Sequence, residues 1–337
     1  ATNKAGILSK LGLTGRSEAH VKAGVEIQTL GNLTIGNGTD INLSTVRAGG
    51  EPLTLTVRSA GDINVKSTVS DGFTLSGTTL NIAAGDATSM RFVSGADTSS
   101  AKLSATQTDT SKGHFTLDGG KIIRTTAGSI DVNAAGDVRL MAPTLTTASA
   151  IYVAGRTSAL DSDERFTTTP FATTAYTNAR FTERGGRLTI AAGGNVGSYA
   201  SVSTVNGVTT LTPQQVTQMT GNYFYHGGNP NAALATQRVP VAWWTGINAF
   251  RQGFGSFGGG NISVTAGNDI SNIAVVAPTN ARVVQVVNDA GEVVQTRLKE
   301  LNGGDIDVLA GRNVDGGVYF LGRGRGRIAA GGAINRG

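Results

Sequence analysis

The chain has 337 residues, of which 48 are glycine and 7 are proline, and charged residues make up 15%. An apolar content of 39% is adequate for a core, which excludes a disordered chain, and a net charge of +5 is too small for this length to indicate a specific nucleic-acid partner. The absence of cysteine excludes disulfides, thiolate metal sites and a cysteine nucleophile.

The N-terminal segment does not have the pattern of a signal peptide. Residues 1–20 lack the continuous apolar core of a signal peptide, and no run in the chain approaches the ~20 apolar residues of a transmembrane helix. The chain starts without methionine, so we expect a piece of a longer or processed protein. Its many β-branched, Thr, Ser and Asn residues favour strands and turns, and they predict an all-β fold.

A short pattern recurs along the chain: two apolar residues at alternate positions, followed by a small-residue corner that ends in glycine. Copies begin, in chain order, at Val21, Leu53, Leu80, Ile130, Ile151, Leu188, Ile262, Ile306 and Arg327. The corner glycines of neighbouring copies are 24, 19 and 20 residues apart, at the pairs Gly61 and Gly85, Gly136 and Gly155, and Gly311 and Gly331. Such spacing predicts a parallel β-solenoid of roughly 11 to 13 coils, in which each coil buries its apolar face against the next.

The copy "ISVTAGNDI" shows what each position is expected to do. Strand alternation places Ile262 and Val264 inside the coil. Gly267 suits a corner because glycine adopts positive φ without a steric penalty. Asn268 and Asp269 are expected to bond turn amides, and Asn residues aligned on successive coils are expected to form a hydrogen-bonded ladder.

Three segments interrupt this rhythm and divide the chain. Coils are predicted over 1–196, with a loop excursion near 156–186. Coils are predicted again over 261–337, and a hairpin near 281–298 is expected to protrude from them, with its turn at Asn288 to Gly291. Between them, residues 197–260 form an aromatic-rich insert, in which "LTPQQVTQM" predicts a short helix with Thr212 as N-cap and Pro213 at the first position.

The insert holds nine of the 19 aromatic residues of the chain and has two interpretations. Its aromatic side chains either pack against the flank of the solenoid or are presented to a sugar or protein partner. The candidate recognition surface comprises Tyr223, Phe224, Tyr225, Trp243 and Trp244.

Motifs for catalysis, cofactors and metals are weak or absent. Neither GxGxxG before a helix nor GxxxxGK[ST] occurs, and the Asp-rich calcium nonapeptide does not recur. Two carboxylate pairs have spacing that acid/base catalysis could use, Asp161 with Asp163 and Asp305 with Asp307. The three histidines, His20, His114 and His226, share no motif. We therefore predict no catalytic residues, no cofactor and no metal, and we expect Arg323, Arg325 and Arg327 to form an outward basic stripe if they lie on one strand.

The repeated cadence, with its "AGGN", "AGND" and "AGD" corners, resembles the repeats of the filamentous haemagglutinin family of two-partner secretion exoproteins from Gram-negative bacteria. The resemblance implies a right-handed parallel β-helix, export through an outer-membrane partner transporter, and a place on the cell surface or outside the cell. No secretion domain or toxin domain is recognisable in the sequence.

We expect the structural shaft of an adhesin that contacts a receptor or glycan on a host or neighbouring cell. End-to-end self-association is a further expected partner interaction. Two alternatives stay open: a parallel β-helix enzyme that degrades polysaccharide, which three or more carboxylates converging in one groove would favour, and a self-assembling extracellular filament subunit.

Overall fold

The computed structural model describes residues 3–17, 19–76, 79–144, 147–166, 179–205, 208–213, 223–229 and 239–336. Strands dominate these residues, with one seven-residue α-helix, α1 (Lys4–Lys10), and the single-turn 3₁₀ helices η1 (Leu43–Thr45) and η3 (Ile247–Ala249). The prediction of an all-β protein is confirmed.

Three long parallel sheets, which we name A, B and C, form the body of the molecule. Sheet A contains β1 (Gly24–Thr29), β4 (Thr54–Ser59), β9 (Ser89–Ser94), β12 (Ile130–Ala134), β18 (Leu188–Ala192), β24 (Ile262–Ala266), β29 (Ile306–Ala310) and β32 (Gly326–Ala330). Sheet B contains β2 (Leu33–Ile35), β5 (Ile63–Val65), β10 (Phe115–Leu117), β13 (Val138–Met141), β19 (Val196–Val205), β25 (Ile270–Ser271), β30 (Val314–Asp315) and β33 (Ile334–Asn335), with β20 (Val208–Pro213) antiparallel to β19. Sheet C contains β3 (Ile41–Asn42), β6 (Val69–Asp71), β11 (Ile122–Thr125), β14 (Ala150–Val153), β23 (Gly253–Ser256), β26 (Ala274–Ala277) and β31 (Val318–Leu321).

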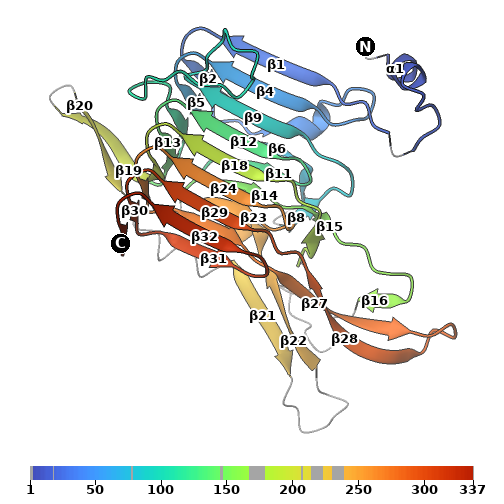
Figure 1. Ribbon diagram of the computed structural model, residues 1–337. Helices are drawn as coiled ribbons and strands as arrows, with labels where there is room; N and C mark the ends of the chain where they lie inside the picture. The colour runs from blue at the N-terminus through green and yellow to red at the C-terminus, as the bar shows by residue number, and fades with distance from the viewer. Residues whose placement is uncertain are drawn as a thin grey trace.

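The chain visits sheets A, B and C in turn, and we call each such set of strands a rung. The first rung is β1, β2 and β3, and the last described rung is β32 with β33. In Figure 1 the strands of sheet A lie side by side from the N-terminal to the C-terminal end of the body. The described residues give sheet A eight strands, so the expectation of 11 to 13 coils is wrong, because excursions between rungs use the remaining chain.

The excursions carry strands of their own. β7 (Phe73–Ser76) and β8 (Thr79–Ile82) form a hairpin, and β15 (Arg156–Thr157) pairs with β17 (Thr182–Glu183). A further sheet, which we name the arm, contains β16 (Glu164–Phe166), β21 (Phe224–Asn229), β22 (Val239–Thr245), β27 (Asn280–Val287) and β28 (Val293–Leu301). In Figure 1 the arm extends below and to the right of the C-terminal rungs of the body.

Two features of the predicted insert differ from the structure. Thr212 and Pro213 lie in β20 and not at a helix start, because this segment turns back on β19 as an antiparallel hairpin, and residues 214–222 lie outside the described residues. β23 is a strand of sheet C, although the sequence placed it within the insert.

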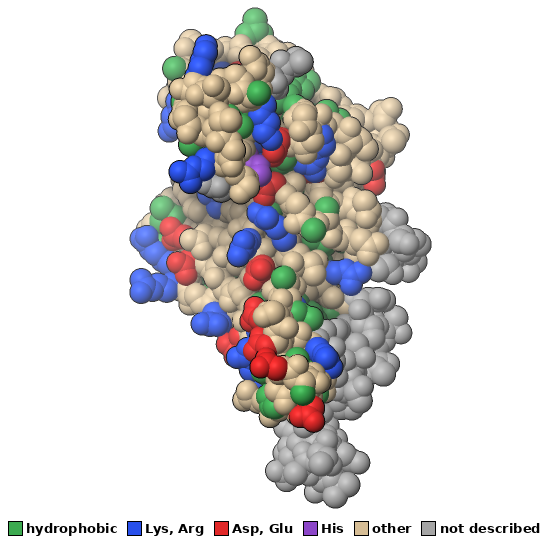
Figure 2. All heavy atoms as spheres, turned by 90° about the vertical axis from the view of Figure 1, so that its right-hand side faces the viewer, with side chains coloured by type: hydrophobic (Ala, Val, Ile, Leu, Met, Phe, Trp, Pro, Cys, Tyr) green, Lys and Arg blue, Asp and Glu red, His purple; other side chains and the backbone are tan. Residues whose placement is uncertain are grey.

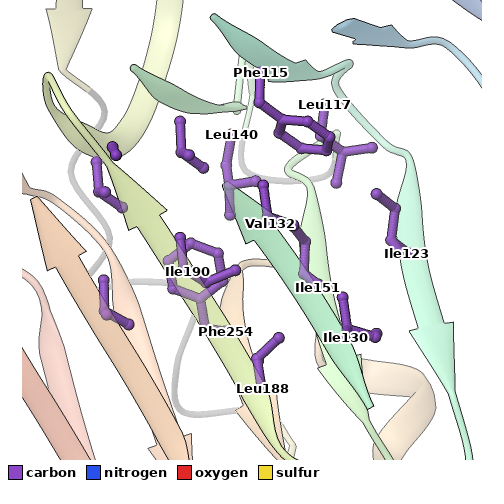
Figure 3. Close-up of a cluster of buried hydrophobic side chains, with 14 of the residues drawn as sticks. Phe115, Leu117, Ile123, Ile130, Val132, Leu140, Ile151, Leu188, Ile190 and Phe254 are labelled. Carbon is purple, nitrogen blue, oxygen red and sulfur yellow. The ribbon is translucent and has the colours of Figure 1, made fainter. Parts of the chain in front are cut away.

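Inward-facing apolar residues of sheet A stack in columns through the rungs. The parallel register places one column in line: Ile27, Val57, Phe92, Val132, Ile190, Val264, Val308 and Ile328. Its six inner members are at most 2% exposed. Figure 3 shows Val132 and Ile190 among residues of sheets B and C such as Phe115 and Ile151, and full burial of each such side chain contributes about 1.5–3 kcal/mol.

Glycines at the end of the sheet A strands form a second column. A Cβ on Gly267 would overlap the carbonyl group of Gly193, and a Cβ on Gly311 would overlap that of Gly267. These three residues do not have positive φ, so the expectation of a left-handed corner glycine is wrong here. Glycine is required because the backbones of successive rungs touch. Glycines just before the sheet A strands make the same close approach to a carbonyl group of the previous rung. They are Gly128, Gly186, Gly260 and Gly304.

The residue before each sheet B strand links one rung to the next. Its side chain accepts a hydrogen bond from the backbone N–H of the equivalent residue in the following rung. The series, which we name the corner ladder, is Asn32, Asp62, His114, Asp137, Asn195, Asp269, Asn313 and Ala333, with bonds of 2.8 to 3.2 Å, and Ala333 takes part only as the last N–H donor. The corner side chains therefore bond amides of the neighbouring rung.

His114 differs from the other acceptors of the corner ladder because it accepts through nitrogen. Its Nδ1 lies 3.0 Å from the backbone nitrogen of Asp137, so this ring nitrogen must be unprotonated. Burial and the charge of Arg139 lower the pKa of His114, while Asp137 and Asp62 oppose this shift.

Gly267→Ala is expected to lower the free energy of unfolding by about 2 kcal/mol or more, because the new methyl group meets rigid backbone. Gly24→Ala is the matched control, since Gly24 lies in β1 without positive φ and its Cβ would meet no atom within 4 Å. Urea unfolding of both variants measures the difference, and equal losses would contradict the glycine contact.

His114→Asn keeps an acceptor and removes the titration. The wild-type free energy of unfolding is expected to be highest above about pH 6.5, the ordinary pKa of histidine, and to decline below it, because the unfolded chain takes up a proton that the folded imidazole resists. Urea unfolding over a pH series is expected to show a flatter dependence for the variant. An unchanged slope would show that His114 does not accept this bond.

Candidate functional site

The arm is the largest departure from the regular rungs, and it contains the predicted hairpin. β27 and β28 pair antiparallel along their length, and the turn between them is closed by a bond from the Gly291 N–H to the Asn288 carbonyl, with Gly291 at φ 80°. β21 pairs with β22, and β22 reaches β27 through the bridge between Trp243 and Ala281.

An aromatic cluster fixes the base of the arm against sheet C. The Tyr152 ring lies at 5.5 to 6.1 Å from the rings of Phe73, Phe250 and Phe257 in edge-on geometry. Tyr223, which precedes β21, adds its ring to Phe250 at 5.3 Å. Such edge contacts each contribute about 0.5–1.5 kcal/mol beyond burial.

The five candidate recognition residues are divided between core and surface. Tyr223 and Trp244 are 3% exposed, so their rings are not available to a partner. Phe224 is half-buried and packs on Phe320 of β31 at 5.3 Å. Tyr225 is 37% exposed and stacks over Trp244 at 6.1 Å, and Trp243 is half-buried. Of the five candidates, Tyr225 and Trp243 therefore keep accessible ring surface, on opposite faces of the β21–β22 pair, because Tyr225 lies opposite Trp244 and Trp243 lies opposite His226. Val241, two residues before Trp243, is exposed.

A buried carboxylate joins the 156–186 excursion to the hairpin. Glu164 is buried, and its two oxygens lie 2.7 Å from Nη2 of Arg297 and 2.7 Å from Nζ of Lys299. Lys299 also lies 2.7 Å from Asp161. Burial raises the pKa of Glu164, but hydrogen bonds from Lys299, the Asp161 N–H and Arg297 outweigh it and lower that pKa to about 2. The sequence pattern gave no sign of Glu164, because its partners lie far along the chain.

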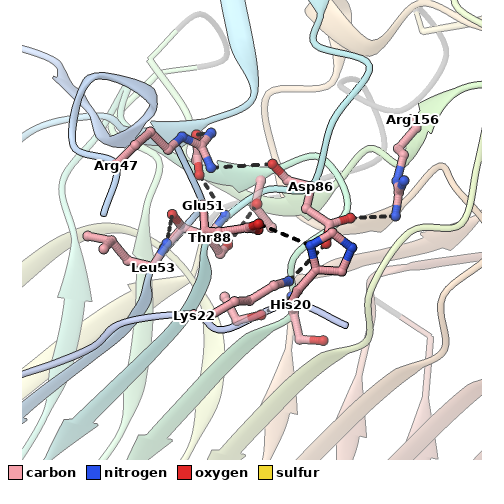
Figure 4. A network of polar contacts seen from close by, with 12 residues as sticks. His20, Lys22, Arg47, Glu51, Leu53, Asp86, Thr88 and Arg156 are labelled. Carbon is pink, nitrogen blue, oxygen red and sulfur yellow. Dashed lines mark hydrogen bonds and ion pairs between the residues drawn. The ribbon is translucent and has the colours of Figure 1, made fainter. Parts of the chain in front are cut away.

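A second polar network ties the N-terminal segment to the body (Figure 4). Asp86 bonds Lys22 at 3.0 Å and Arg156, and the hydrogen bond from Lys22 is the main cause that lowers the pKa of Asp86. Glu51 accepts from Lys4 at 2.9 Å and lies 3.1 Å from His20. Both carboxylates of this network, Glu51 and Asp86, are therefore paired with basic side chains of the same network.

The carboxylate pairs named from the sequence do not converge. Asp161 pairs with Lys299, whereas Asp305 accepts the Arg325 N–H and belongs to a corner. Asp307 lies 4.0 Å from Arg327. Among the described residues, no three His, Asp or Glu side chains are placed to hold a metal ion.

The expected stripe of three arginines is not formed. Only Arg327 lies in β32, while Arg323 and Arg325 sit in the preceding corner, where their N–H groups bond Thr279 and Asp305. Figure 2 shows basic and acidic side chains interspersed on the face that lies to the right in Figure 1. That distribution does not favour an extended anionic partner.

Comparison with protein-family models, with curated proteins and with solved structures gives no match to this chain. In the part of the chain that the structure describes, no helix is long and apolar enough to cross a bilayer.

Glu164→Gln is expected to lower the free energy of unfolding by about 2 kcal/mol at pH 7, because the buried oxygens lose their charge-assisted bonds. The pKa of Glu164 is lowered in the fold, so the wild-type advantage is present above about pH 4.5 and is lost as the pH falls toward 2. Glu292→Gln, at the exposed hairpin turn, is the control. Hydrogen exchange of β28 amides and urea unfolding report the effect, and equal behaviour of the two variants would contradict it.

Proposed function

We propose that the chain is a right-handed parallel β-helix and serves as the shaft of a large secreted or surface-exposed exoprotein of the filamentous haemagglutinin kind. The observation that carries this proposal is the unbroken parallel register of sheet A through eight strands. Each rung bonds only its neighbours, so length is gained by adding rungs, and a rod of roughly 34 Å follows at about 4.8 Å per rung.

The body suits a spacer because its stability is distributed along its length. Every inner rung contributes backbone bonds, buried apolar residues and one member of the corner ladder. The absence of cysteine fits export of an unfolded chain through an outer-membrane transporter, which is the partner this proposal requires.

The arm gives the shaft a surface for contact with a receptor or glycan. Its hairpin exposes Val293 and Val294, at 48% and 61%, and its other strands expose Tyr225. A rigid aromatic ring supported by Trp244 loses little conformational entropy on binding. The resulting role is adhesion through the arm, with the body holding that surface away from the cell.

An adhesion assay tests this proposal. Beads coated with the purified chain are expected to bind bacterial or host cells, or immobilised glycans, above beads coated with an unrelated β-rich protein. Failure to bind any of these surfaces would contradict the adhesive role. Release of soluble sugar from a polysaccharide panel would favour the enzyme instead.

Tyr225→Ala combined with Trp243→Ala is expected to reduce bead binding at least tenfold, because hot-spot aromatics each contribute about 2 kcal/mol or more. Leu309→Ala is the matched control, since Leu309 is 39% exposed on the outer face of sheet A, away from the arm. Circular dichroism checks that both variants fold. Equal binding by variant and control would place the contact outside the arm.

A further inference from the structure

The outer strand of the arm, β28, has a strand on one side only among the described residues. It pairs with β27, and β27 separates it from β16 and β22. In Figure 1 the hairpin of β27 and β28 extends to the lower right of the body. The side chains from Val293 to Arg297 are all exposed, and Val294 is 61% exposed. In the part of the chain that the structure describes, β28 is therefore an open edge strand.

The pairing of β27 shows which backbone groups of β28 face outward. The N–H of Val287 donates to the Asp163 carbonyl, so odd-numbered residues of β27 bond toward β16. Backbone groups alternate between the two sides of an antiparallel strand, so even-numbered residues of β27 bond β28, and one of them lies opposite Arg297. Arg297 therefore bonds inward. The N–H and C=O groups of its neighbours, Thr296 and Leu298, point away from the sheet, in a stretch where the register is regular.

The basic side chains of β28 do not guard this edge. Exposed edge strands are commonly protected by Lys or Arg side chains, whose charge opposes the approach of a second strand. On β28, however, Arg297 and Lys299 each lie 2.7 Å from the buried Glu164. They lie on the opposite face of the strand from Thr296 and Leu298, because side chains alternate. Their charges are therefore compensated within the arm, and the outward backbone groups stay available.

The tip of the hairpin determines the charge of a partner that fits this edge. Three carboxylates lie at the tip, and none has an ion pair among the described residues: Asp163, Asp289 and Glu292. Arg165 is the basic side chain that comes near the turn, at Gly291. Val293 and Val294 follow the turn and are exposed. An acidic tip beside exposed apolar side chains is complementary to a partner with basic and apolar side chains.

We infer that β28 binds an extended, basic segment of a partner protein as an additional strand of the arm. The outward groups of Thr296 and Leu298 bond the backbone of this segment, and its basic side chains lie near the acidic tip. The inference rests on the proposed adhesive role of the arm and names the partner as a polypeptide, because a row of backbone donors and acceptors complements another backbone.

Fluorescence anisotropy with two labelled eight-residue peptides and the full chain tests the inference. One peptide alternates valine with lysine, and the other alternates valine with glutamate. The lysine peptide is expected to bind at least about tenfold more tightly than the glutamate peptide, and more weakly as salt is raised.

A proline in β28 tests the role of the backbone. Thr296→Pro removes one outward N–H and leaves the bonds to β27 intact, as proline does on an edge strand. It is expected to weaken binding of the lysine peptide at least about tenfold, because the strand loses a donor and a site for close approach. Thr296→Ala keeps the N–H and is the matched control. Circular dichroism checks that both variants fold.

Amide hydrogen exchange locates the bound peptide. The lysine peptide is expected to slow exchange at Thr296 and Leu298 about tenfold or more, because these N–H groups gain partners only on binding. The amides of Gln295 and Arg297 already face β27 and are expected to change less.

A charge reversal tests the acidic tip. Asp289→Lys is expected to weaken binding of the lysine peptide about two- to fivefold. Asp40→Lys, at an exposed position of the body, is the matched control and is expected to leave it unchanged.

The inference and the adhesive role fail in different ways. A lysine peptide that does not bind, or that binds equally to Thr296→Pro and Thr296→Ala, overturns the inference. Beads coated with Thr296→Pro that adhere to cells as well as wild type overturn it too and leave the adhesive role standing. Beads that adhere to no surface, although the lysine peptide protects Thr296 and Leu298, contradict the adhesive role and support binding at β28.

Discussion

The rest of the structure depends on one constraint, the close parallel pairing of each rung with the next. The strands must approach to about 4.8 Å for their backbone groups to bond, and this spacing applies at the corners as well as along the strands. Glycine at Gly193, Gly267 and Gly311 allows that approach, since any Cβ there would overlap the carbonyl of the previous rung. Because each rung repeats the one before it in register, equivalent side chains stack on one another. This stacking produces both the interior columns and the corner ladder.

The pairing also explains which parts of the fold the sequence could predict. Alternation around Ile262 and Val264 predicted inward side chains, and both are buried, because strand periodicity is a local property. The reason expected for Gly267 was wrong, because contact between backbones of different rungs is not visible in a single repeat, whereas the corner glycine Gly155 does have positive φ. The rung count was too high because excursions such as β7 with β8, and β15 and β17, occupy chain that the repeat spacing assigned to coils.

The candidate site was predictable only in part. An aromatic-rich segment was evident from the sequence, but which of its rings face outward depends on tertiary packing. Tyr223 packs on Phe250 and is buried, whereas Tyr225, two residues later, is exposed. Glu164 was missed because Arg297 and Lys299 reach it from the far hairpin. The molecule therefore has two parts, a repetitive body and an irregular arm that is held by aromatic and ionic contacts.

Distances between spin labels test the central claim most directly, and the absence of native cysteine makes the labelling clean. One label replaces Glu26 in the first rung, and the second replaces Thr189, Ser263 or Asp307, which lie in successive rungs of the same column. Stacked rungs predict mean distances of roughly 19, 24 and 29 Å, a constant increase of about 4.8 Å per rung whatever the sequence separation. Distances that fail to rise in equal steps would contradict the stacked parallel body on which the account rests.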